Sequence, residues 1–196
     1  MENGHQMAIF SKFVNHHILN LANLIKTKIN TLKMDTFKIY TIGVYQTTEQ
    51  SFFGKLVQNN ISLFCDIRQR RGIRGAQYKY VNSNYLQSKL SELKIPYIYI
   101  KELAPTKEIR QKQKDADKLN NETKKQRTIL GEVFINEYCE QILNKFNMET
   151  FINELQKKGI KNVLFFCVEE QAKACHRSLV AKRLSKEFGG IEIINL

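Results

Sequence analysis

From Phe37 to the end of the chain, short apolar runs alternate with longer segments in which apolar residues recur every three or four positions. The runs are typical of buried strands, and the periodic segments are typical of amphipathic helices. The expected strands cover residues 37–43, 61–68, 96–103, 160–168 and 191–196. The run at 160–168 is almost continuously apolar, which indicates a strand buried on both faces. This alternation predicts an α/β fold: a single three-layer domain with a mainly parallel sheet of about five strands flanked by helices.

Helices are expected between these strands, at residues 47–60, 82–95, 129–146, 148–159 and 175–190. In the first of them a threonine cap precedes an apolar stripe that includes Phe52 and Leu56. The last is expected to end at Gly189–Gly190, because glycine commonly terminates a helix.

Two segments depart from this alternation. Residues 1–36 have apolar residues at helical spacing but contain only two acids, Glu2 and Asp35, so we expect an N-terminal extension, helical in form, ahead of the α/β domain at 37–196. A highly charged insert at about 104–130 has almost no apolar stripe before residue 127. We expect it to form a solvated helix or a mobile lid near the basic rim of the sheet.

Charge and cysteine content bear on partners and location. The formal net charge of +12 favours anionic partners, either an anionic small molecule or nucleic acid. The four cysteines do not form a dense disulfide framework, the sequence has no secretory signal pattern, and no apolar run is long enough to span a bilayer. We therefore expect a cytoplasmic protein with free thiols and no transmembrane segment. The sequence leaves the cofactor, and whether a metal binds, undetermined.

Polar residues lie at the carboxyl ends of several of the expected strands. They are Thr41 and Gly43, Asp66 and Arg68, and Cys167 and Glu169. In open α/β sheets the ligand crevice lies at the carboxyl ends of the strands, so these groups are expected to converge on one site. The loop after Asp66 adds Arg71 and Arg74 to the candidate ligand-binding residues, because no acid occurs between Ile67 and Ser91 and arginine clusters bind phosphate. A solvated basic loop is the alternative.

The densest cluster of reactive side chains is the stretch Cys167 to Ser178, with Cys175, His176 and Arg177 at the expected start of the last helix. A helix N-terminus and a neighbouring arginine lower the pKa of a thiol, so Cys175 or Cys167 is a candidate nucleophile. Glu169 is a candidate acid or base, or a partner of Arg68 or Arg177. The alternative is a pair of buried structural cysteines. Seven residues separate the two cysteines, which fits no common zinc pattern, so we assign no metal ligand.

Three motifs carry a family resemblance: Thr41-Ile42-Gly43, Asp66-Ile67-Arg68, and Cys167-Val168-Glu169 with Cys175-His176-Arg177-Ser178. With them, residues 37–196 resemble the "domain of unknown function 488" family. The resemblance implies a cytoplasmic α/β domain of prokaryotic type in which these residues face one site, but no settled reaction. Many members have histidine where this chain has Val44, and other branches have a glycine pair where it has Ala104-Pro105, so the substrate pocket is expected to differ.

These observations lead to two hypotheses. The first is an enzyme that acts on a small anionic, phosphorylated or nucleotide-like ligand, with Cys167, Glu169, Cys175 and His176 as catalytic residues and Arg68 and Arg177 among the ligand-binding ones. The second is a nucleic-acid-associated binding module without catalysis, in which the same arginines grip phosphates and the cysteines are structural.

Overall fold

A computed structural model of the chain describes residues 37–73, 75–121, 123, 127–187, 189 and 191–196. The expected N-terminal extension at 1–36, the ligand-binding candidate Arg74 and part of the charged insert lie outside the described residues.

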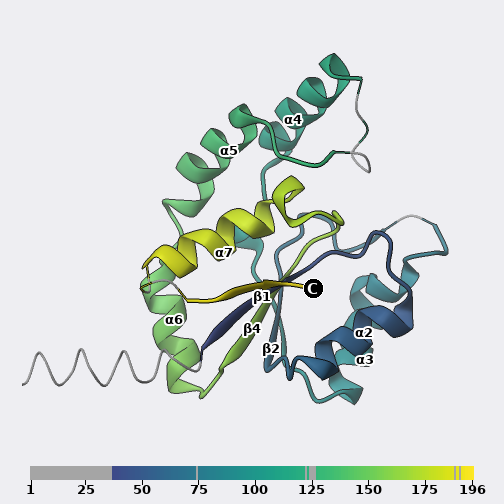
Figure 1. The fold of residues 1–196 in the computed structure, drawn as a ribbon, viewed down its shortest axis with the longest axis vertical. Coiled ribbons are helices and arrows are strands. Elements are labelled where there is room, and N and C mark those ends of the chain that lie inside the picture. Colours follow the sequence, from purple (N-terminus) through teal and green to yellow (C-terminus); the bar gives the residue numbers. More distant parts are fainter. Residues whose placement is uncertain (1–36, 74, 122, 124–126, 188, 190) are drawn as a thin grey trace, which may run out of the picture. The chain divides into compact units, whose positions relative to one another are not determined.

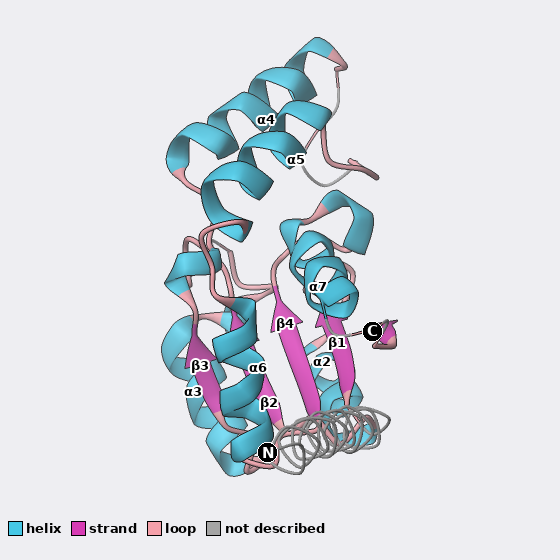
Figure 2. Cartoon of the chain, turned by 90° about the vertical axis from the view of Figure 1, so that its left-hand side faces the viewer, coloured by secondary structure: helices cyan, strands magenta, loops and turns pink. Residues whose placement is uncertain are grey.

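The five expected strands are confirmed. They are β1 (Lys38–Ile42), β2 (Leu63–Asp66), β3 (Tyr97–Tyr99), β4 (Asn162–Phe166) and β5 (Ile193–Asn195). They form one sheet in the order β3-β2-β4-β1-β5, and every neighbouring pair is parallel. Figure 2 shows β4 at the centre of this sheet. The predicted parallel α/β sheet is therefore confirmed.

The helices are α2 (Glu49–Gln58), α3 (Ser83–Glu92), α4 (Lys107–Leu119), α5 (Glu132–Tyr138), α6 (Met148–Lys157) and α7 (His176–Glu187). Helices α2 and α3 lie on one side of the sheet, and α6 and α7 lie on the other (Figure 1). Helix α5 continues into a π-helical turn at Cys139–Leu143. None of the helices in the described part of the chain has the length and apolar character needed to cross a membrane.

Burial follows the predicted pattern most clearly at β4. Its residues Val163 to Phe166 are all buried, because helices cover both faces of the central strand. Phe166 packs against Phe52 of α2 and Phe64 of β2, with ring centroids 5.4 and 5.3 Å apart. The threonine cap of α2 is Thr48, whose side chain accepts a hydrogen bond from a backbone N–H in the first turn.

The order of the strands opens a crevice at one end of the sheet. Strands β1 and β2 lead to helices on one face, whereas β4, which lies between them, leads to α7 on the opposite face. The loops therefore diverge where the strands end. In register, Ile42 of β1 and Asp66 of β2 both pair with Phe166 of β4, so the three strands end at the same level.

The charged insert contains a regular helix. Helix α4 is capped by the side chain of Thr106, and the residues it buries, Ile109, Gln113 and Asp117, recur every four positions along one face. Of the two expected forms, the structure has a helix with one buried face. Its expected mobility remains a prediction.

Candidate active site

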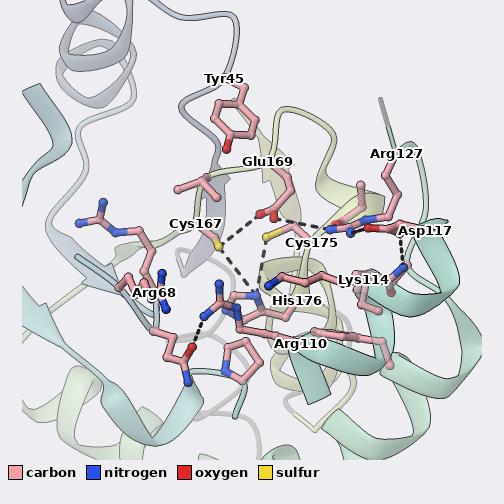
Figure 3. Close-up of a pocket in the computed structure, with 18 of the residues that line it drawn as sticks. Tyr45, Arg68, Arg110, Lys114, Asp117, Arg127, Cys167, Glu169, Cys175 and His176 are labelled. Carbon is pink, nitrogen blue, oxygen red and sulfur yellow. Dashed lines mark hydrogen bonds and ion pairs between the residues drawn. The ribbon is translucent and has the colours of Figure 1, made fainter. Parts of the chain in front are cut away.

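A cavity of about 610 Å³ lies at the carboxyl ends of β2 and β4 (Figure 3). Its walls come from the loops after these strands, from α4 and α5, and from the start of α7. The cationic residues that line it are Arg68, Arg70, Arg110, Lys114 and Arg127, and the acidic ones are Asp117 and Glu169. The four residues proposed from sequence as catalytic, Cys167, Glu169, Cys175 and His176, all line this cavity.

Two thiols and one imidazole form a compact cluster in the cavity wall. The Sγ atoms of Cys167 and Cys175 each lie 3.8 Å from Nδ1 of His176. All three side chains are buried. Cys167 follows β4 directly, whereas Cys175 comes immediately before the first residue of α7, His176. Cys175 thus lies one position outside the helical turn in which the sequence placed it, and its carbonyl oxygen accepts the hydrogen bond from the Ser178 N–H.

The orientation of the His176 ring is fixed by the loop after β2. Nε2 lies 3.0 Å from the carbonyl oxygen of Ile67. A carbonyl oxygen only accepts hydrogen bonds, so Nε2 carries the proton and donates. In the neutral ring Nδ1 is then the atom with the free lone pair, and it faces both sulfur atoms.

The residues of the cluster shift one another's pKa values. Burial by itself raises the pKa of the Cys175 thiol, but the hydrogen bond with Cys167 and the charge of His176 outweigh it and hold that pKa well below its ordinary value. Burial lowers the pKa of His176, but the charge and hydrogen bond of Cys175, followed by the charge of Glu169, raise it above its ordinary value. These opposite directions favour a thiolate on Cys175 beside an imidazolium on His176.

Glu169 joins the cluster to a buried arginine. One carboxylate oxygen lies 3.4 Å from Sγ of Cys167, and the other lies 3.5 Å from Nη2 of Arg127. Arg127 also forms an ion pair of 2.8 Å with Asp117 of α4, and it donates to the carbonyl oxygen of Ala174. Among the described residues, Nε of this buried arginine has no hydrogen-bond partner. The sequence suggested Arg68 or Arg177 as the partner of Glu169, and the structure has Arg127 instead.

Sequence reasoning missed Arg127 and Asp117 because both lie in the charged insert, which was read as solvated. The available signal was the four-residue spacing of Ile109, Gln113 and Asp117, which puts two polar residues on the buried face of a helix. The Gln113 side chain links the buried face of α4 to the segment before α5, since it donates to Asp117 and accepts from the Gly131 N–H.

Arg68 lines the cavity but is held by the protein itself. Its guanidinium makes two hydrogen bonds with Asp66, at 2.9 and 2.7 Å, and a third with the carbonyl oxygen of Val81. It also lies over the ring of Phe166, 4.5 Å from the centroid. Asp66 is fully buried beneath it and does not line the cavity.

Thr41, Gly43 and Arg177, proposed from sequence as ligand-binding residues, do not line the cavity. Instead they hold the loop that carries Glu169. The buried guanidinium of Arg177 donates to the carbonyl oxygens of Glu169 and Glu170 and to the Thr41 hydroxyl. A Cβ atom on Gly43 would lie 2.0 Å from the carbonyl oxygen of Glu169, so only glycine lets β1 approach the loop this closely.

The basic loop after β2 contributes Arg70 to the cavity wall. Arg70 lines the cavity together with Gln69, which accepts a hydrogen bond from Arg110 of α4. Arg71 lies outside the lining and stacks over the Tyr99 ring, 4.4 Å from its centroid.

Comparison with known proteins identifies a family, but the family has no assigned reaction. The family model described as "Domain of unknown function DUF488" matches residues 48–184. No curated protein and no solved structure matches the chain. The matched segment contains the ends of β2 and β4, the whole thiol–imidazole cluster, and both Asp117 and Arg127.

Proposed function

The chain belongs to the DUF488 family, which is defined by a domain of unknown function. For this member of the family we propose an enzyme that acts on a small anionic ligand of the phosphorylated or nucleotide-like class. The observation that carries this proposal is the position of the thiol–imidazole–carboxylate cluster inside a cavity with more cationic than acidic side chains. Even without Arg68, which is paired with Asp66, the lining contains four cationic and two acidic residues. Cations above a buried reactive cluster attract an anion and hold it there.

The acids in the cavity do not cancel this charge. Asp117 and Glu169 both form ion pairs with the same arginine, Arg127. The lining has three further cations, Arg70 of the loop after β2 and Arg110 and Lys114 of α4. In addition, the Nε–H of Arg127 has no acceptor among the described residues although it is buried. A buried donor without a partner costs free energy, and a phosphate or carboxylate oxygen is an acceptor that would relieve this cost.

The size of the cavity favours a small molecule. A volume of about 610 Å³ falls within the range of roughly 300–1,000 Å³ that is typical of small-molecule and cofactor sites. Glu169, Cys167 and the Cys175–His176 pair meet at its wall, so a ligand held by the cations would lie against them. We assign these four residues as the reactive centre, and Arg70, Arg110, Lys114 and Arg127 as the anion-binding groups.

The alternative, a non-catalytic nucleic-acid-binding module, has less support. Two of the arginines that were expected to grip phosphates, Arg68 and Arg177, are buried and donate to the protein's own Asp66, Val81, Glu169 and Glu170. Buried arginines that are occupied in this way cannot track a phosphate backbone.

Two charge-matched double variants on α4 test the anion-binding part. Arg110→Ser/Lys114→Ser removes two cations that line the cavity, and Lys107→Ser/Lys118→Ser removes two from the same helix that do not. We expect the first to weaken binding of AMP or inorganic phosphate by about tenfold, since two ionic contacts contribute roughly 1–2 kcal/mol. The control should bind within about twofold of the unchanged protein. Titration calorimetry measures both affinities.

Two outcomes would count against the proposal. If neither probe binds at millimolar concentration, the cavity is not an anion site of this class. If a single-stranded oligonucleotide binds instead and both double variants weaken its binding equally, the surface charge as a whole is responsible and the nucleic-acid module is favoured.

Catalysis is tested separately, by mass spectrometry of nucleotides and sugar phosphates incubated with the protein. Any conversion should be lost in Cys175→Ser and retained in Cys139→Ser.

A further inference from the structure

The three ligand-type atoms of the cluster stand at the separations that a metal ion requires. Sγ of Cys167, Sγ of Cys175 and Nδ1 of His176 all lie within 4.8 Å of one another, and both sulfur–nitrogen distances are 3.8 Å. A tetrahedral zinc ion, with Zn–S of about 2.3 Å and Zn–N of about 2.0–2.1 Å, separates its sulfur and nitrogen ligands by about 3.6 Å. Each sulfur–nitrogen distance therefore needs to change by only a few tenths of an ångström.

The hydrogen bond of His176 is the second observation that points to a metal. Metal-binding histidines nearly always donate the N–H that faces away from the ion to a carboxylate, a backbone carbonyl or water. Here Nε2 donates to the carbonyl oxygen of Ile67, so that Nδ1 faces both sulfur atoms and presents its lone pair to them once its own proton is lost (Figure 3). The loop after β2 thus holds the ring in the tautomer and orientation that a metal ligand needs.

Charge balance selects the kind of ion. Two thiolates neutralise a divalent cation, so the occupied cluster would carry no net charge although Cys167, Cys175 and His176 are all buried. Thiolate and imidazole together are ligands of a borderline-soft ion such as Zn²⁺ and not of Mg²⁺ or Ca²⁺, which take oxygen ligands.

Three protein ligands leave the fourth coordination position of a tetrahedral ion open toward the cavity. Glu169 is not a member of the group of mutually close ligand atoms: one of its carboxylate oxygens contacts Cys167, and the other is in the ion pair with Arg127. All three ligands line the cavity wall. A site with three protein ligands and one open position is typical of catalytic zinc, whereas structural zinc has four protein ligands.

We propose that Cys167, Cys175 and His176 bind one Zn²⁺ ion whose fourth position opens into the cavity. Its catalytic meaning rests on the function proposed above: the ion would contact an oxygen of the anionic ligand or a bound water, beside Glu169. The separation of the two cysteines in sequence argued against a metal, but it only reflects the loop that runs from the end of β4 to the start of α7. In space that loop brings the ligands together.

Metal analysis of the untagged full chain tests the proposal without a substrate. We expect about one zinc per chain by plasma mass spectrometry, and about one tightly bound Zn²⁺ when apoprotein is titrated against a chromogenic chelator. Cys167→Ser, Cys175→Ser and His176→Gln should each lower zinc affinity by at least about tenfold. Cys139→Ser removes a thiol outside the cavity and should leave the affinity unchanged.

A spectroscopic measurement on the unchanged chain guards against variants that fail to fold. Co²⁺ added to apoprotein should give a thiolate-to-cobalt charge-transfer band and the strong visible bands of tetrahedral coordination, and inorganic phosphate or AMP should shift the visible bands through the open position. Absence of the charge-transfer band, or retention of less than one tenth of an equivalent of zinc by correctly folded protein, would overturn the metal site. Visible bands that ignore both anions would overturn the open position. Loss of anion binding in the α4 double variant is independent of these results, so the two proposals fail separately.

Discussion

Among the glycines that the structure describes, Gly43 is the one at which an added methyl group should have the largest effect, although it does not line the cavity. An alanine there would put Cβ 2.0 Å from the carbonyl oxygen of Glu169, about 1 Å closer than real Cβ contacts allow. The obstacle is a backbone oxygen, so no side-chain rotation relieves it. Either β1 or the loop after β4 has to move in Gly43→Ala.

The loss of unfolding free energy in Gly43→Ala can be estimated from the hydrogen bonds that this movement would break. The backbone N–H groups of Val44 and Tyr45 both donate to the Val168 carbonyl oxygen at 3.1 Å, and Arg177 donates to the Glu169 carbonyl oxygen. Overpacking of this kind costs about 1–3 kcal/mol, and each hydrogen bond lost adds about 1 kcal/mol. We therefore expect Gly43→Ala to lower the free energy of unfolding by roughly 2–4 kcal/mol. In a chain of this length each kcal/mol lowers Tm by about 2–4 °C.

Gly54→Ala is the matched control, because it makes the same chemical change with the opposite expected sign. Gly54 lies in α2, and nothing stands within 4 Å of the position of its added Cβ. Alanine in a helix interior is favoured over glycine by about 0.5–1 kcal/mol, so this variant should be slightly stabilised. Urea unfolding followed by circular dichroism measures both. If Gly43→Ala proves as stable as the unchanged protein, the close approach of β1 to the Glu169 loop does not hold that loop in place.

Further predictions concern the supports of the site. Arg68→Ala should lower the free energy of unfolding by about 3–5 kcal/mol, measured in urea, because it leaves the buried charge of Asp66 without its partner; an additional Asp66→Asn change should recover part of that loss. Thr48→Ala should cost about 1 kcal/mol in the same assay through loss of the α2 cap. Burial, followed by the charge of Asp66, raises the pKa of Tyr97 from 10.0 to about 12. Its neutral phenol therefore stabilises the fold fully below about pH 10, and that contribution is lost as pH rises toward 12; Tyr97→Phe should show a shallower fall in unfolding free energy over this interval. In hydrogen exchange, amides of α4 should exchange faster than those of β4.

The sheet could be predicted from sequence because its signal is local. A central parallel strand is buried on both faces, so 160–168 had to be apolar, and the observed β4 lies within that range. The parallel arrangement then implied that Asp66 and Cys167 lie where two strands end at the same edge. The structure places the ends of β2 and β4 side by side in this way, with Asp66 paired in register with Phe166.

The roles of individual arginines could not be predicted, because a guanidinium looks the same in sequence whether it binds a ligand or a backbone carbonyl. Arg177 was expected to bind a ligand, yet its donors meet Thr41, Glu169 and Glu170. Which carbonyl oxygens lie within reach depends on how tightly β1 and the loop after β4 approach each other. That approach is decided by Gly43, far away in sequence, and no local pattern reports it.

The same reasoning explains why the charged insert matters to the site. Asp117 of α4 pairs with Arg127, Arg127 pairs with Glu169, and Glu169 contacts Cys167. Each link is buried, so removing one leaves a charge in the interior without its partner, which is costly. If α4 moves, the ion pair between Asp117 and Arg127 has to break or Arg127 has to move with it. If Arg127 moves, its ion pair with Glu169 is disturbed as well, and the carboxylate beside the thiols loses one of its contacts. Through these two ion pairs the insert is connected to Glu169 at the reactive cluster.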